Sequence, residues 1–349
     1  MSKETILRAL AGQTVDRVAV GPLAVHFCAG LLGVSLADYT LRPQVLADCA
    51  IAYYRRFRPD AVWISADTWV TAEAMGKQVA FPGPDQPLGG TPEPLVRTAA
   101  DLARIPPPDP FQQGRCPRML EAVRRVVDAI GREALVVACF DQYPFSLACA
   151  LMGVERLMLA MVDDRPLVAA LLDRCAEFAI AYGKALAAAG AGSLSGGDSP
   201  AGLTGPRLYR EVALPAEQQV IAALRTTGLP VSLHICGNAL PILADMARSG
   251  ATVLELDQRV DLAEACRIVP DGTAIWGNLD PVQLLRGTPD EVRQASLSAM
   301  QTVAAAGRRR FVLSSGCTLA IGTPPENVAA LIASAGEATP ERRGSPSAR

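Results

Sequence analysis

The chain has 349 residues, of which 50% are hydrophobic and 19% charged, and its formal net charge is -2. The length fits one α/β barrel or two ordinary domains, and the balanced charge without a basic stripe argues against a nucleic-acid surface. The most apolar windows carry Glu, Lys and Gly and are too interrupted to span a bilayer, and no signal peptide opens the chain. Nine scattered cysteines fit a reducing cytosol. We therefore expect a soluble cytoplasmic protein that uses neither a membrane nor a nucleic acid.

Apolar runs of strand length alternate along the chain with longer segments of helical period. The expected strands lie at 17–23, 61–65, 134–139, 192–194, 231–235, 252–256, 273–276 and 311–314. The expected helices between them lie at 43–58, 118–130, 165–189, 206–225, 240–248, 262–269 and 288–306. Continuous apolar strands that alternate with amphipathic helices are typical of a parallel sheet covered by helices.

Eight such strands predict a single-domain (β/α)8 barrel, the TIM-barrel fold, over residues 1–338. A doubly wound sheet is the alternative, but it would normally carry a G-x-G-x-x-G motif after its first strand, which this sequence lacks. The Pro- and Gly-rich segment 81–111 predicts a long loop or flap, and residues 339–349 predict a disordered tail.

In a barrel of this kind the chemistry lies where strands end, so the reactive side chains after each predicted strand are the candidates for function. They are Asp67, Asp141, Tyr143, Asp198, His234, Cys236, Glu255, Asp257, Asn278, Asp280 and Cys317. Their gathering at the ends of strands predicts an active site on one face of the barrel.

The segment VSLHICGN places His234 and Cys236 two residues apart at the end of a strand, so both side chains project to the same side. Cys317 follows the last strand, and closing the barrel carries it to the same rim. Imidazole and thiolate groups are good Zn²⁺ ligands, and three protein ligands leave a fourth position open for catalysis. Ordinary burial of cysteine in the core is the alternative explanation.

A zinc ion with two thiolates and one imidazole is electron-rich and suits the binding of a thiol better than the production of hydroxide. Metal coordination deprotonates a thiol, whose free pKa is about 8.5. The sulfur can then attack a methyl group in line.

Three stretches carry a resemblance to a known family: LHICGNALPILADMARSGATVLELDQRVDL, WGNLDPVQLLRGTPDEV and LSSGCTLAIGTPPENVAALI. They resemble the uroporphyrinogen decarboxylase superfamily, in its branch of cobalamin-dependent methyltransferases that act with methylcobamide and coenzyme M. The resemblance extends from SADTWVTAEAMG to the final helix. It implies a (β/α)8 barrel in which His234, Cys236 and Cys317 hold a catalytic zinc that activates the thiol acceptor of a methyl group from a corrinoid.

The decarboxylase branch is the first competitor. Its members carry an R-Q-A-G-R segment near the N-terminus and a late histidine loop, whereas this chain has VHFCAGLLG and SSGCTL at those places. Asp67 aligns with the aspartate that decarboxylases use, but this residue is shared more widely in the superfamily. Neither His26 nor His234 lies in the D-x-H-x-x-G motif of corrinoid domains, so we expect cobalamin to come from a separate corrinoid protein or as the free cofactor.

Five further residues are candidates for the expected site. Asp67 is a candidate catalytic residue that orients substrate or binds a cationic group, and the alternative is a helix N-cap. Tyr143 and Asn278 are candidate substrate-binding residues, although a tyrosine also often serves only in packing. Glu255 and Asp257 are candidates for a fourth zinc ligand or a partner of His234.

The sequence thus predicts methyl transfer between a corrinoid and a thiol or other small methyl donor or acceptor. A porphyrinogen decarboxylase and a non-catalytic binding protein are the alternatives.

Overall fold

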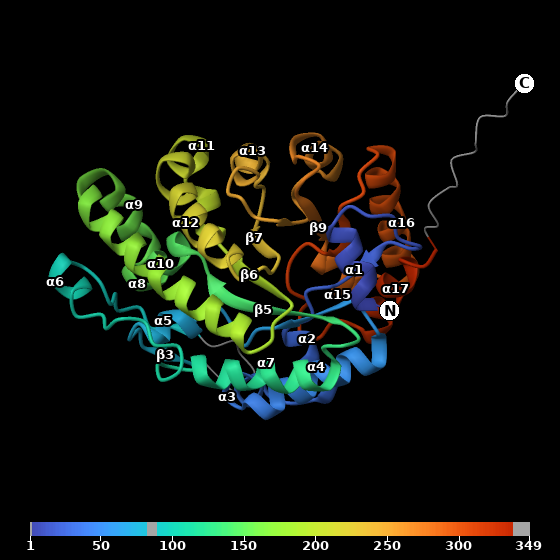
Figure 1. Cartoon of the computed structure of the whole chain (residues 1–349), viewed down its shortest axis with the longest axis horizontal. Coiled ribbons are helices and arrows are strands. Elements are labelled where there is room, and N and C mark those ends of the chain that lie inside the picture. The colour runs from blue at the N-terminus through green and yellow to red at the C-terminus, as the bar shows by residue number, and fades with distance from the viewer. Residues whose placement is uncertain (1, 82–88, 338–349) are drawn as a thin grey trace, which may run out of the picture.

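The computed structural model of the chain describes residues 2–81 and 89–337. Eight parallel strands form one sheet in the order β1-β10-β9-β8-β7-β6-β5-β2 (Figure 1). They are β1 (Ala19–Val20), β2 (Ala61–Ile64), β5 (Leu135–Gln142), β6 (Ser193–Gly197), β7 (Val231–Ile235), β8 (Val253–Leu256), β9 (Ala274–Leu279) and β10 (Phe311–Ser315). Each overlaps one of the predicted strands, so the single-domain barrel is confirmed.

The sheet closes between its two end strands through one aspartate. The backbone N–H of Asp60 donates to the carbonyl of Val20 at 2.9 Å, and the Asp60 carboxylate accepts from the Val20 N–H at 2.9 Å. Arg17 binds both oxygens of the same carboxylate at 2.6 Å. Side-chain bonds therefore complete the barrel where the strand ladder is too short to do so.

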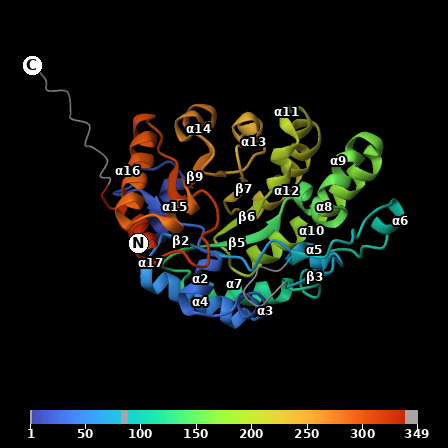
Figure 2. The same cartoon turned by 180° about the vertical axis from the view of Figure 1, so that it is seen from behind.

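Helices that return the chain from one strand to the next surround the barrel, and the first helix, α1 (Ser2–Leu10), lies on the same side as the last (Figures 1 and 2). In α7, buried residues recur three and four positions apart, which is the pattern of a helix with one apolar face. The return helices are α4 (Pro43–Phe57), α7 (Cys116–Ile130), α10 (Arg165–Ala188), α12 (Leu214–Arg225), α13 (Leu243–Met246), α14 (Leu262–Ile268) and α16 (Pro289–Ala305), and α17 (Pro325–Ser334) follows the last strand.

Two predicted helices are divided in the structure. The segment 240–248 forms a 3-10 turn (Leu240–Ile242) and then α13. The segment 206–225 forms α11 (Gly205–Leu208), a π-helical turn (Tyr209–Ala213) and then α12. Pro215 has no N–H to donate to the carbonyl four residues earlier, so the regular hydrogen-bond ladder cannot run through this point.

Several short helices at the ends of strands have no counterpart among the predicted elements. The helix α8 (Pro144–Met152) is buried on nearly all sides, so its sequence shows no amphipathic period. The others are α2 (His26–Leu32), α3 (Leu36–Leu41), α5 (Val70–Ala74), α9 (Val154–Asp163) and α15 (Pro281–Arg286).

The predicted flap at 81–111 is only partly described. A short antiparallel pair, β3 (Val79–Ala80) with β4 (Gly89–Gly90), flanks residues 82–88, which lie outside the described residues, and α6 (Ala99–Leu102) follows. The predicted tail 339–349 also lies outside them. Within the described part of the chain, no single helix is long and apolar enough to cross a membrane. Only α8 and α9 taken together meet that test, and they are bent by 106°.

Candidate metal centre

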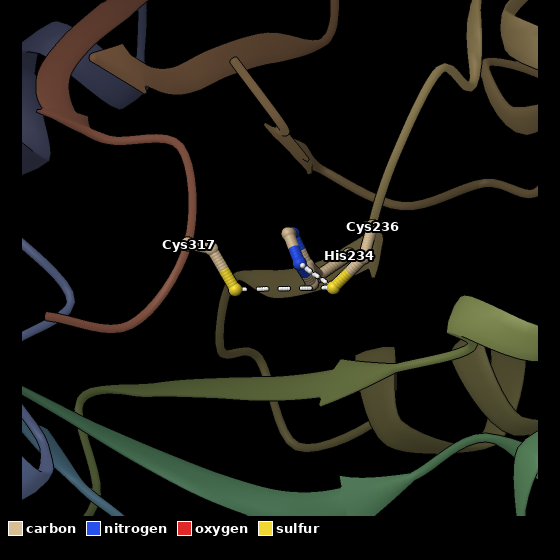
Figure 3. Close-up of side chains that lie close together, drawn as sticks. All are labelled: His234, Cys236 and Cys317. Carbon is tan, nitrogen blue, oxygen red and sulfur yellow. Dashed lines mark hydrogen bonds between the residues drawn. The ribbon is translucent and has the colours of Figure 1, made fainter. Parts of the chain in front are cut away.

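Three soft side chains converge at the C-terminal end of the barrel, as Figure 3 shows. His234 lies on β7, Cys236 is the first residue after that strand, and Cys317 is the second residue after β10. The His234 Nε2 lies 2.9 Å from the Cys236 Sγ, which lies 3.8 Å from the Cys317 Sγ. All three atoms lie within 4.8 Å of one another.

The His234 ring is held by the neighbouring strand. Its Nδ1 lies 3.0 Å from the backbone carbonyl of Glu255, which is the residue paired with His234 between β7 and β8. A carbonyl only accepts, so Nδ1 carries a hydrogen and the other nitrogen faces the two thiols. A carbonyl partner of this kind is the usual outer support of a metal-binding histidine.

Hydrogen bonds among the three groups also shift their pKa values. The hydrogen bond from Cys317 lowers the pKa of Cys236 to about 7, and the same bond, together with burial, raises the pKa of Cys317 to about 12. Burial lowers the pKa of His234, but Cys317 and Glu255 more than offset this effect and raise it to about 9. A cation that binds here replaces these protons, so its affinity depends on pH.

The donor set fits zinc. Two Zn–S bonds of about 2.3 Å in a tetrahedral site place the sulfur atoms about 3.8 Å apart, which matches the distance between the sulfurs of Cys236 and Cys317. The His234 Nε2 is closer to sulfur than the roughly 3.6 Å of such a site, so a small outward movement of the ring completes the fit. Cys236 is exposed, and an exposed ligand leaves room for a substrate at the fourth position.

The Glu255 carboxylate lies in the barrel interior and bonds to hydroxyl groups. One oxygen accepts from Ser195 at 2.9 Å and from Ser232. Glu255 therefore supports His234 through its carbonyl, which is one of the two roles considered from the sequence. The two serines gave no recognisable motif, because their partner comes from another strand.

Asp67 lies at the end of β2 and is bound by an arginine of the protein itself. Arg115 donates to both of its carboxylate oxygens, at 2.5 and 3.1 Å, and to Glu73 at 2.5 Å. The Trp69 N–H donates to Asp67 at 2.7 Å. The N-cap of α5 is Trp69 and has no side-chain capping bond, so Asp67 is not the helix N-cap considered as the alternative. The catalytic role of Asp67 stays a prediction. Reasoning from the sequence missed Arg115, which lies in no motif and is 48 residues away.

The two expected substrate-binding residues make contacts within the protein. The Tyr143 hydroxyl is buried and donates to the Ser232 carbonyl at 2.7 Å. The Asn278 amide donates to the carbonyls of Asp257 at 3.0 Å and Val260 at 2.8 Å. Contact of either residue with a substrate stays a prediction.

Asp141, after β5, has an unusual backbone and environment. Its φ of 66° is left-handed, and its carboxylate accepts from the Thr71 N–H at 2.8 Å and from the Thr71 hydroxyl at 3.2 Å. Burial, followed by the charge of Asp67, raises the pKa of this carboxyl to about 8. Left-handed residues and shifted carboxyls concentrate at functional rims.

The known proteins that this chain resembles include methyltransferases and decarboxylases. A family model described as uroporphyrinogen decarboxylase (URO-D) matches residues 1–338. A methylcobamide:CoM methyltransferase of Methanosarcina mazei is 31% identical, covering 95% of this chain and 96% of its own. A uroporphyrinogen decarboxylase of Streptomyces griseus is 33% identical, covering 74% and 70%. The solved structure of a methyltransferase from Methanosarcina mazei has a TM-score of 0.87 at 27% identity, covering 96% of this chain and 98% of its own.

Proposed function

Because the chain belongs to the uroporphyrinogen decarboxylase (URO-D) family, we propose that it is a zinc-dependent methyltransferase of that family. It moves a methyl group between a corrinoid and a thiol or another small nucleophile or donor. The observation that carries this proposal is the convergence of the His234 nitrogen with the sulfurs of Cys236 and Cys317. The methyltransferase of Methanosarcina mazei supports it over nearly the whole chain.

His234, Cys236 and Cys317 would hold the zinc ion. When bound, the ion supplies Lewis acidity that keeps an incoming thiol deprotonated at neutral pH. The protein's own contribution is orientation: the Glu255 carbonyl fixes the imidazole, and the exposed side of Cys236 leaves the approach to the cluster open. Holding the acceptor in one place at the mouth lowers the entropic cost of meeting the methyl group.

The methyl carrier comes from outside the chain in this proposal. The sequence has two histidines, and neither lies in a D-x-H-x-x-G motif that would place it beneath cobalt. In the structure His234 belongs to the cluster, and the His26 Nε2 lies 2.9 Å from the Ala66 carbonyl. A separate corrinoid protein or free cobalamin therefore delivers or receives the methyl group. Nine free cysteines are consistent with action in the cytoplasm.

Decarboxylation of a porphyrinogen is the second candidate, favoured by the Streptomyces relative and by the presence of Asp67. Against it, both Asp67 oxygens accept hydrogen bonds from Arg115, so this carboxylate already has a cationic partner within the protein.

One experiment separates the two candidates. Zinc content is measured on the purified full chain and on Cys317→Ala, and both are assayed with methylcobalamin plus a panel of thiols that includes coenzyme M, and with uroporphyrinogen. The methyltransferase predicts about one zinc per chain, thiol methylation, and loss of both in the variant. Turnover of uroporphyrinogen that is indifferent to Cys317→Ala would establish the decarboxylase instead.

A further inference from the structure

The third ligand arrives on a loop whose path is set by close contact with the turn after β8. Gly316 directly precedes Cys317, and its N–H donates to the Leu279 carbonyl at 2.6 Å. A Cβ atom on Gly316 would lie 2.4 Å from the backbone nitrogen of Gln258 and 3.1 Å from the Asp257 carbonyl carbon. Real side-chain carbons essentially never come within 3.0 Å of such atoms. Only glycine allows the loop to lie this close to the turn.

The turn itself is held by the amide of Asn278. The two donor hydrogens of this amide go to the carbonyls of Asp257 and Val260, which lie on either side of the bend. The Val260 N–H also donates back to the Asp257 carbonyl at 3.0 Å. The Asn278 amide therefore holds the backbone on both sides of Gln258, the residue that Gly316 contacts.

The same stretch of backbone also orients the first ligand. The Glu255 carbonyl, at the start of this stretch, receives the Nδ1–H of His234 at 3.0 Å. One continuous segment, residues 255–260, thus binds the imidazole of His234 and contacts the loop of Cys317. These two ligands are 83 positions apart in the sequence.

We propose that residues 255–260 form a positioning platform for the metal centre, and that Gly316 and Asn278 are positioning residues that seat Cys317 on it. This inference rests on the proposed function, because it concerns the metal that the three ligands would hold. It assigns Asn278 to the geometry of the centre and not to contact with substrate.

The expected consequence follows from distances. A methyl group at position 316 must move from 2.4 Å to at least 3.0 Å from the Gln258 nitrogen, a displacement of about 0.6 Å. Metal–ligand bonds tolerate about 0.2 Å. The loop that carries Cys317 is therefore pushed away from the turn, and we expect the bond from this sulfur to the metal to be loosened.

The test compares Gly316→Ala with Gly322→Ala in the full-length protein. Gly322 lies on the same loop, but a Cβ there meets only a Leu285 methyl at 4.0 Å, so its variant is a matched control. Each protein is titrated with Co²⁺ alone, and the sulfur-to-cobalt charge-transfer absorption reports how many thiolates bind. Zinc affinity is measured by competition with a chelator, and far-UV circular dichroism checks the fold.

The platform predicts two thiolates on cobalt in the wild type and in Gly322→Ala, and one in Cys317→Ala. In Gly316→Ala the Cys317 thiolate is loosened, so the charge-transfer absorption should lie between these two values. Zinc affinity should fall about 10–100-fold in Gly316→Ala, the range seen when an outer support is removed. The zinc affinity of Asn278→Ala should also fall. If Gly316→Ala does not fold, the charge-transfer absorption of Asn278→Ala tests the platform instead.

Two outcomes are decisive in different ways. If Gly316→Ala keeps the wild-type charge-transfer absorption and the wild-type zinc affinity, the platform is overturned but the metal centre stands. The same result in Asn278→Ala overturns the platform if Gly316→Ala does not fold. A wild-type chain that gives no charge-transfer absorption and binds no zinc overturns the proposed function itself.

Discussion

At the ends of β2 and β5 the rim of the barrel carries carboxylates that the protein neutralises itself, whereas at the ends of β7 and β10 it carries soft donors that face one another. Arg115 and Asp67 form a buried ion pair with side-chain exposures of 3% and 4%. His234, Cys236 and Cys317 are hydrogen-bonded to one another, and the Glu255 carbonyl supports His234. From this difference we expect the first half to contribute mainly to stability and the second half to retain bonding capacity for a ligand.

Removal of Arg115 should give the largest change in stability. In Arg115→Met the buried carboxylate of Asp67 and the partly exposed carboxylate of Glu73 lose their partner. We expect unfolding in urea to require about 3–5 kcal/mol less free energy. The matched control is Arg293→Met, which breaks the exposed pair with Glu337 and should cost less than about 1 kcal/mol. Zinc content per folded chain should not change. Loss of zinc in Arg115→Met would break the distinction between the two halves of the rim.

Cys317→Ala should show the opposite pattern. We expect zinc affinity to fall by more than the roughly 100-fold that marks loss of an outer support. The unfolding free energy measured with excess chelator should stay within about 1 kcal/mol of the wild type. Competition with a chromogenic chelator gives the affinity. An unchanged affinity would mean that the sulfur of Cys317 is not a ligand.

Asp141 allows the carboxylate half to be tested by pH. Its pKa is about 8 in the folded protein, against an ordinary value near 4 in the unfolded chain. The folded state therefore keeps a proton that the unfolded state has released, and the contribution of this group to stability falls as pH rises from about 4 to 8.

The neutral variant Asp141→Asn lacks this dependence while it tolerates the same left-handed backbone. Relative to the variant, the wild type should lose roughly 1 kcal/mol of unfolding free energy per pH unit between pH 5 and 8. Urea unfolding at several pH values provides the measurement. Parallel pH profiles for the two proteins would show that Asp141 ionises normally.

Tyr143→Phe should have the smallest effect. The variant loses one buried hydrogen bond to the Ser232 carbonyl, which costs about 1 kcal/mol of unfolding free energy. If the hydroxyl serves packing alone, KM and kcat for methyl transfer stay at wild-type values. A rise in KM would support the substrate contact predicted from the sequence.

The two halves of the rim also differ in how far they could be predicted. His234 and Cys236 are recognisable because both lie at one strand end, and the barrel order then brings Cys317 to them. The Arg115–Asp67 pair is set by tertiary packing over 48 residues and has no local pattern. The hydrogen bonds of Asn278 depend on the backbone path of the turn after β8, which no local pattern around Asn278 predicts. Most strands were predictable because they are apolar runs, although β6 (SLSGG) is not. The helix α8 is buried on nearly all sides and shows no period.

The β10 strand pairs with both β1 and β9, so it joins the first strand of the barrel to the strands that precede it. Cys317 comes two residues after that strand. During refolding, His234 and Cys236 can meet as soon as β7 forms, but a complete set of ligands exists only once β10 has been inserted. Tight capture of an added metal ion would therefore report the moment at which β10 joins the sheet.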